Sequence, residues 1–361
     1  MDADLVLEGG GVKGIGLVGA IRGLGDAGYR FHRVAGTSAG AIVGSLAAAG
    51  VPAEQLQRIM HELDYRKFQD GNLLTRLGRP GAALQMLLHK GVYKGDWLHD
   101  WVAGQLADAG VRTWGDLRIS QQDDPGSALP PARSYKLVVI VSDVTDNRLL
   151  RLPWDYDRLG VSAGEVDEMP VADAVRASAS IPFFFQPCML KVPGRGGQVY
   201  LTDGGMLSNF PIDVFDRRDE RRPRWPTFGV KLSARPGANL LAPAQSIRGV
   251  VRFALALVAT MANAHDQMHL DDPSVVDRTV FVDTFGVKST DFHLDAKTRD
   301  QLFDEGMRSG KKFLAGWNFD RYLDTYWKPA AAEGAGRAPT ATAATAATTA
   351  EAAAKPAGDG A

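Results

Sequence analysis

Residues 31–49 read FHRVAGTSAGAIVGSLAAA, and this stretch decides the fold class. The segment Phe31–Ala35 indicates a strand, and Ala39–Ala49, which is rich in alanine and is followed by a glycine, indicates a helix. Between them, GTSAG fits the pattern G-x-S-x-G with Ser38 at its centre. A serine in this pattern, between a strand and a helix, is typical of a nucleophile elbow.

The small residues of this turn have a physical role in that interpretation. Gly36 and Gly40 lack a Cβ, so the chain can turn sharply and the helix can pack close to the strand. We then expect the Ser38 hydroxyl at the carboxyl edge of the sheet, with the backbone N–H of Ala39 available to an oxyanion. The five residues alone are equally consistent with an ordinary turn in which the serine caps the helix.

Strands and helices alternate through most of the chain. This alternation predicts an α/β fold with a largely parallel central sheet between two helical layers, a three-layer α/β/α arrangement. The β-branched run Leu137–Val141 suits a central strand that is covered on both faces. The other predicted strands are Leu5–Leu7, Val199–Thr202 and Phe228–Leu232, and the other predicted helices are Ile15–Ala27, Pro52–Leu63, Ala172–Ser180 and Ser246–Met268.

A glycine cluster, EGGGVKG at Glu8–Gly14, directly follows the first predicted strand. Its successive amides can converge on one anion, assisted by the N-terminus of the next helix and by the charge of Lys13. The cluster also fits the dinucleotide pattern G-x-G-x-x-G, but in two registers, which makes that match weak. That pattern further expects an acid after the second strand, where the sequence is VAGTSAG. A tight turn with no ligand is a third interpretation.

A third motif, DGGMLSNFP at Asp203–Pro211, begins at the end of another predicted strand. Two glycines after Asp203 predict a tight turn from which the carboxylate can project. An ordinary Asp-Gly turn is the more common explanation of such a motif when it stands alone.

The motifs gain specificity from their order along the chain. Gly9–Gly14 (GGGVKG), Gly36–Gly40 (GTSAG) and Asp203–Gly205 (DGG) occur in the order of the patatin-like phospholipase family, which the sequence resembles from about Asp4 to Asp213. The segment ASASIPFFFQP at Ala177–Pro187 also looks like the family's segment between the serine and aspartate motifs.

This resemblance implies a patatin-like fold and a serine acyl hydrolase that cleaves fatty-acyl esters of lipids or phospholipids. It implies a Ser–Asp dyad, in which Ser38 is the nucleophile and Asp203 its base, and it requires no metal or other cofactor. Because an ordinary aspartate is a weak base, we expect burial to raise its pKa. The resemblance places the oxyanion hole at Gly9, Gly10, Gly11, Val12, Lys13, Gly14 and Ala39, with motif support from Gly36, Gly40, Gly204 and Gly205.

Three alternatives belong to other classes of protein. A Ser–His–Asp esterase on the α/β-hydrolase fold needs a histidine after the acid, and His265, His269 and His293 are available. Against it, the elbow at residue 38 comes too early to follow the usual leading strands. The second is a dinucleotide-binding oxidoreductase, which the absent acid disfavours, and the third is a non-catalytic lipid-binding module.

Composition limits the other possibilities. The chain has 41 Lys and Arg against 42 Asp and Glu, so no overall positive charge favours nucleic acid, and we expect none as a partner. One cysteine excludes an internal disulfide and a cysteine-based zinc site. The acidic start MDAD is unlike a signal peptide, and no apolar run reaches the length of a membrane span. These features predict a cytoplasmic protein, with peripheral contact to a membrane as an option.

The composition also divides the chain. Residues 4–327 are predicted to form one acyl hydrolase domain, and residues 328–361, rich in Ala and Thr, a disordered tail. Within the domain, Tyr65–Trp101 mixes basic and apolar residues, which suggests a lid that meets anionic lipid surfaces. An ordinary helical insertion with a core face explains the same mixture. Phe183–Phe185 could line an acyl channel or belong to the core.

Overall fold

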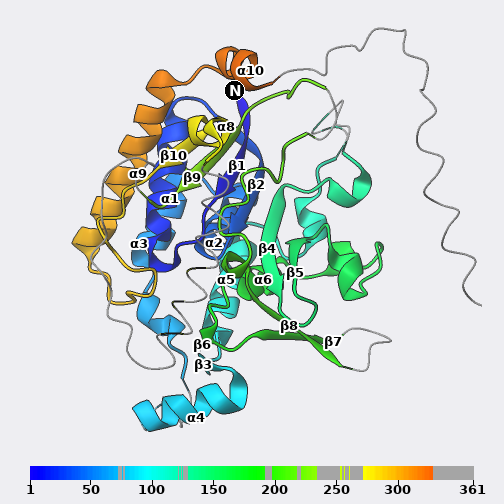
Figure 1. The fold of residues 1–361 in the computed structure, drawn as a ribbon, viewed down its shortest axis with the longest axis vertical. Helices are drawn as coiled ribbons and strands as arrows, with labels where there is room; N and C mark the ends of the chain where they lie inside the picture. Colours follow the sequence, from blue (N-terminus) through cyan, green and yellow to red (C-terminus); the bar gives the residue numbers. More distant parts are fainter. Residues whose placement is uncertain are drawn as a thin grey trace, which may run out of the picture.

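The structure is a computed structural model of the chain, and one central sheet organises it (Figure 1). It describes residues 1–71, 75, 78–120, 122, 124, 129–191, 197–217, 221–233, 253, 256, 260 and 271–327. The predicted tail at 328–361 lies outside the described residues, as do most of the predicted helix at 246–268 and the side chains of His265 and His269.

The strand order of the sheet is β10-β9-β1-β2-β4-β8-β7, with β5 paired to β4. The five strands from β10 to β4 are parallel, whereas β8 and β5 run antiparallel to β4, and β7 runs antiparallel to β8. The predicted α/β class with a largely parallel sheet is therefore confirmed. The strands are β1 (Asp2–Leu7), β2 (Arg30–Thr37), β4 (Leu137–Asp143), β5 (Arg148–Leu152), β7 (Cys188–Lys191), β8 (Gln198–Asp203), β9 (Thr227–Lys231) and β10 (Thr279–Phe281).

The sheet is buried on both faces, as the continuous apolar run of β4 predicts. All residues of β4 are buried, and alternate side chains enter two different clusters. Val139 and Val141 belong to the larger cluster, together with residues of the helices that cover this face. Val138 and Ile140 belong to a smaller cluster. In the described part of the chain, that second face is covered by a segment of turns at 210–215 and the short helix α8, so its layer is thinner than a row of long helices.

Four of the described helices, α1, α2, α3 and α6, lie close to the predicted positions, and the other five were not predicted from the sequence. Helix α1 packs along α9, and α2 lies against β2 behind the elbow (Figure 1). None of the described helices is both long and apolar enough to cross a bilayer. The helices are α1 (Gly14–Asp26), α2 (Ala39–Ala48), α3 (Ala53–Glu62), α4 (Arg79–His89), α5 (Asp96–Asp108), α6 (Val171–Ser178), α8 (Pro273–Asp277), α9 (Ala296–Gly316) and α10 (Phe319–Tyr326).

Short elements connect these layers. A two-stranded parallel sheet joins β3 (Gly91–Tyr93) to β6 (Phe183–Phe185), so the chain after α4 is tied to the chain after α6. The 3₁₀ turns are η1 (Gly11–Lys13), η2 (Tyr65–Phe68), η4 (Trp114–Leu117), η5 (Pro131–Arg133), η6 (Tyr156–Leu159), η7 (Val166–Glu168) and η8 (Gly204–Met206).

Candidate active site

Ser38 lies in the strained turn between β2 and α2. Its backbone has φ 53° and ψ −119°, a conformation that residues other than glycine rarely adopt. The turn is tight because a Cβ on Gly36 would lie 2.2 Å from the carbonyl oxygen of Gly40, and one on Gly40 would lie 2.3 Å from that of Leu7. The backbone N–H of Ser38 donates to Ser178 Oγ at 2.9 Å. The elbow geometry thus depends on glycines at two positions and on one buried hydroxyl.

Asp203 reaches Ser38 because of the direction of β8. Thr37, the last residue of β2, pairs with Ile140 of β4, and Asp203, the last residue of β8, pairs with Val141 on the other side of β4. Because β8 runs antiparallel to β4, its last residue lies inside the edge of the sheet, at the level of the turn that holds Ser38. The Ser38 hydroxyl donates to Asp203 Oδ2 at 2.7 Å.

The environment of Asp203 makes it a stronger base than a free aspartate. Burial raises the pKa of its carboxyl to about 6, although the hydrogen bonds from the Gly205 N–H and the Ser38 hydroxyl favour the ionised form. Gly205 donates to Oδ1 at 2.8 Å, and the residue is 7% exposed. The carboxylate therefore does not project freely from a turn, as the sequence suggested, but is held between a backbone amide and Ser38. A Cβ on Gly204 would lie 2.2 Å from the carbonyl oxygen of Ile140, so this turn also requires close packing.

The glycine loop lies against Ser38. A Cβ on Gly9 would lie 3.2 Å from Ser38 Cβ, and Gly11, with φ +56°, lines the same pocket as Ser38. The amides of Gly10 and Gly11 have no protein acceptor among the described residues. Four other amides of the predicted hole already donate within the protein: Gly9 to Asn209 O, Val12 to Ser289 O, Lys13 to Gly10 O and Gly14 to Gly11 O.

A buried ion pair lies at the start of this glycine loop. Glu8, at the end of β1, pairs with Lys231, at the end of the neighbouring β9, and both side chains are 7% exposed. Glu8 also accepts hydrogen bonds from the Leu232 N–H and from Asn209 Nδ2. Burial lowers the pKa of the Lys13 ammonium nearby, which the charge of Glu8 opposes and that of Lys231 reinforces.

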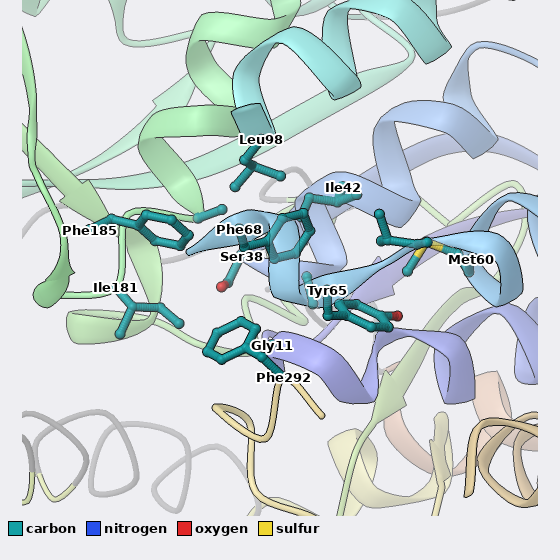
Figure 2. Close-up of a pocket in the computed structure, with 13 residues that line it drawn as sticks. Gly11, Ser38, Ile42, Met60, Tyr65, Phe68, Leu98, Ile181, Phe185 and Phe292 are labelled. Atoms are coloured by element: carbon teal, nitrogen blue, oxygen red, sulfur yellow. The ribbon is translucent and has the colours of Figure 1, made fainter. Parts of the chain in front are cut away.

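An apolar pocket opens beside Ser38 (Figure 2). The volume of this pocket, its open mouth included, is about 430 Å³. Figure 2 shows the Ser38 hydroxyl pointing into the space between Phe185, Ile181 and Phe292. Of the three predicted phenylalanines, Phe185 lines the pocket, while Phe184 stacks on Phe292. The lining residues are Gly11, Ser38, Ala39, Ile42, Met60, Leu63, Tyr65, Phe68, Leu98, Ala179, Ile181, Phe185 and Phe292.

The described histidines do not complete a triad. His293 is exposed, and none of the described histidines hydrogen-bonds to Ser38 or Asp203. Asp203 uses its two oxygens for Ser38 and Gly205. Ser38 and Asp203 are hydrogen-bonded to each other, with no histidine between them.

Some residues of this site were not singled out from the sequence. Ser178 and Asn209 lie inside segments that the family resemblance includes or adjoins, and each contacts the loop or the elbow. Arg176 is buried, and its guanidinium donates to the carbonyl oxygen of Gly95 at 2.8 Å and to that of Gln186 at 3.2 Å. Ser178 and Asn209 lie within quoted segments of the sequence, and Arg176 directly precedes one. Their hydrogen-bond partners could not be predicted, because these partners are distant in the chain.

Comparison with known proteins gives relatives of similar length. A protein of Bacillus subtilis (strain 168), described as uncharacterized protein YqhO, is 36% identical over 319 residues, which are 88% of this chain and 100% of that one. Uncharacterized protein R571 of Acanthamoeba polyphaga mimivirus is 23% identical over 319 residues, which are 86% of this chain and 92% of that one.

Solved structures give more distant similarities. VipD from Legionella pneumophila is 19% identical, with a TM-score of 0.47 and coverage of 87% of this chain and 66% of that chain. The type III effector protein ExoU of Pseudomonas aeruginosa is 16% identical, with a TM-score of 0.41 and coverage of 89% of this chain and 54% of that chain.

A family model for patatin-like phospholipase matches residues 5–216. This match covers more than half of the chain and includes the glycine loop, the elbow and the aspartate motif. Membership of this family supports lipid acyl hydrolase activity in general. On this match, and on a relative of similar length that is 36% identical, the chain belongs to the patatin-like phospholipase family.

Proposed function

We propose that this protein is a serine acyl hydrolase that cleaves fatty-acyl esters of lipids or phospholipids through Ser38 and Asp203. The observation that carries the proposal is the 2.7 Å hydrogen bond from the Ser38 hydroxyl to a buried Asp203, at the wall of an apolar pocket. The hydroxyl already points its proton at the base, as nucleophilic catalysis requires.

In the first step, Ser38 Oγ attacks the ester carbonyl carbon while Asp203 accepts the serine proton. The tetrahedral oxyanion is stabilised by backbone N–H groups, each of which contributes about 3 kcal/mol in such sites. Because the other amides of the loop are already engaged, Gly10 and Gly11 are the donors we assign from it, together with Ala39 at the start of α2. The Lys13 ammonium adds positive charge to the same region.

In the second step, the alcohol leaves with the proton that Asp203 accepted, and the fatty acyl chain stays on Ser38 as an ester. Asp203 then takes a proton from water, which attacks the acyl-enzyme. The bond between the acyl carbon and Ser38 Oγ breaks, the fatty acid leaves, and Asp203 returns the proton to Ser38 Oγ. The apolar pocket supports this substrate class, since its walls consist almost wholly of aliphatic and aromatic side chains.

The test is mass spectrometry of defined phospholipids after incubation with the wild type, Ser38→Ala and Asp203→Asn. We expect free fatty acid and lysophospholipid from the wild type, a loss of at least about 10⁴-fold in Ser38→Ala and about 10³-fold or more in Asp203→Asn. Asp213→Asn, an exposed acid near the same motif, is the matched control and should keep wild-type activity. Equal product from Ser38→Ala would contradict the proposal.

The same assay separates the Ser–His–Asp alternative. A triad requires one of His265, His269 and His293, so Ala substitutions at these three positions should each leave the rate unchanged if the dyad is correct. Loss of activity in one of them, with the unfolding temperature preserved, would favour the triad.

A further inference from the structure

Helix α4 exposes leucine side chains to solvent and buries a glutamine. Gln85 is 1% exposed, whereas Leu84, Leu87 and Leu88 are 45%, 78% and 58% exposed. The three leucines share one face of the helix because they are spaced three and four residues apart. A soluble helix buries such a face and exposes its polar residues. The arrangement of α4 therefore indicates that its outer face meets an apolar medium.

The position of α4 makes this face accessible. Figure 1 shows α4 at one end of the long axis of the molecule, beyond β3 and β6 and away from the central sheet. Because the three leucines are exposed on a helix at this end of the molecule, an extended surface can reach them.

The charge around α4 identifies the medium. From Gly71 to Gly95 the sequence holds no aspartate or glutamate and four basic residues, Arg76, Arg79, Lys90 and Lys94, although the whole chain is nearly neutral. The flanking acids are engaged: Asp70 accepts the N–H groups of Gly95 and Trp97, and Asp96 lies 4.0 Å from the ammonium of Lys94. Of the described cations, Lys94 faces one acid, Asp96, and the ammonium of Lys90 lies 4.8 Å from the ring of Tyr200. Exposed leucines in a stretch with this excess of basic residues suit the interface of an anionic bilayer.

The helix is coupled to the mouth of the catalytic pocket. It continues into β3, which pairs with β6, and Phe185 of β6 lines the pocket. The ring of Tyr93 in β3 lies 4.7 Å from that of Phe184. Arg176 fixes the chain after β3, since it donates to the Gly95 carbonyl. A surface bound at α4 is thus held at a fixed position relative to the pocket.

We propose that α4 is the membrane-docking element of this protein, which inserts Leu84, Leu87 and Leu88 into an anionic lipid surface with Lys90 and Lys94 at the headgroups. The biological role of this docking rests on the proposed function, since it would bring the enzyme to a lipid substrate. The binding of the protein to vesicles can nevertheless be measured without hydrolysis. It develops the lid suggested for Tyr65–Trp101 into a docking role that requires no movement of the segment.

The test is co-sedimentation of the Ser38→Ala protein with vesicles of phosphatidylcholine alone and of phosphatidylcholine with phosphatidylglycerol. We expect binding to the anionic vesicles that decreases with added NaCl, as screening requires. In the same background, Leu87→Ser with Leu88→Ser should weaken binding by about 10- to 100-fold, from the apolar area lost. Lys90→Gln with Lys94→Gln should weaken it by about 25-fold at low salt.

Phe285→Ser is the matched control, because Phe285 is 54% exposed and lies beside residues of α9 rather than α4. It should bind vesicles as the parent does. The unfolding temperature of each variant, and the hydrolysis of a soluble short-chain ester by the same variants with Ser38 restored, show that the fold is intact. If that ester is not cleaved by the wild type, the proposed function fails while the binding result still stands.

Three results would overturn the docking proposal. The first is an absence of binding to anionic vesicles, or equal binding to neutral ones. The second is undiminished binding of the leucine variant. The third is a dimeric parent that becomes monomeric in the leucine variant by light scattering, since the face would then belong to a second copy of the chain.

Discussion

Asp203, the proposed base, has a buried carboxylate that lowers the stability of the fold. Its pKa is raised to about 6 in the folded protein, mainly because burial disfavours the ionised form. Between pH 4 and 6 the folded state therefore binds more protons than the unfolded state, and this contribution to stability decreases as pH rises through that window. Above about pH 7, where the folded carboxyl is almost fully ionised, the loss is nearly complete and constant, with a magnitude of about 2–3 kcal/mol.

This cost leads to a prediction for Asp203→Asn. The variant should lose hydrolysis but gain about 2–3 kcal/mol of unfolding free energy at pH 8, because it removes the buried charge and keeps an oxygen for the Gly205 N–H. At pH 4 the gain should be close to zero. Urea unfolding at the two pH values measures both. A variant that is less stable than the wild type at pH 8 would show that the carboxylate is not destabilising.

At the scale of elements, β1 and β9 are joined beneath the glycine loop by Glu8 and Lys231. Both charges are taken out of water, and the carboxylate of Glu8 also accepts from the Leu232 N–H and from Asn209. Removal of one member of such a buried pair costs more than the pair itself contributes, since a charge is left without its counter-ion.

Glu8→Gln should therefore lower the free energy of unfolding by about 3 kcal/mol. It should also reduce hydrolysis, because Gln has one acceptor oxygen where Glu8 has two, so the Leu232 N–H and Asn209 Nδ2, whose residue accepts the Gly9 N–H, cannot both keep their acceptors. A second substitution, Lys231→Met, on the Glu8→Gln background should recover part of the stability but not the loop geometry. Denaturant unfolding of the wild type, the single variant and the double variant is the measurement, and a loss below about 1 kcal/mol in Glu8→Gln would contradict this role for the pair.

The elements also show what could be predicted from the sequence. Local pattern located the elbow, since a strand, small residues and a helix follow one another within residues 31–49. Family order selected Asp203 among many aspartates. Neither could show that β8 runs antiparallel to β4, because strand direction depends on pairing with residues far away in the chain. That direction is what brings the carboxylate level with Ser38 and buries it.

Hydrogen-bond and ion-pair partners that are far apart in the chain could not be predicted from the sequence either. Glu8 and Lys231 are 223 positions apart, and Ser38 and Ser178 are 140 apart. Each residue is ordinary in its local context, so only the folded structure identifies the pairs. The same holds for the proposed oxyanion hole, because only the structure shows which of its seven predicted residues have an amide that already donates within the protein.

At the scale of the whole molecule, the tail remains a prediction from composition. Residues 329–361 contain 16 alanines and no Leu, Ile, Val or aromatic residue, so they can bury little apolar area. A chain that ends at Trp327 should unfold at the same temperature as the full chain and cleave a soluble ester at the same rate. Differential scanning calorimetry and a kinetic assay on both chains test this, and a clearly lower unfolding temperature in the short chain would assign the tail a structural role.

The most direct measurement of the central claim is the rate at which a fluorophosphonate modifies the protein, followed by intact mass across pH. We predict a single adduct on the peptide that contains Ser38, at a rate that rises with pH to a plateau with a midpoint near pH 6, the pKa of Asp203. Asp203→Asn should react slowly at every pH. An adduct on a different residue, or equal labelling of Ser38 in Asp203→Asn, would contradict the dyad.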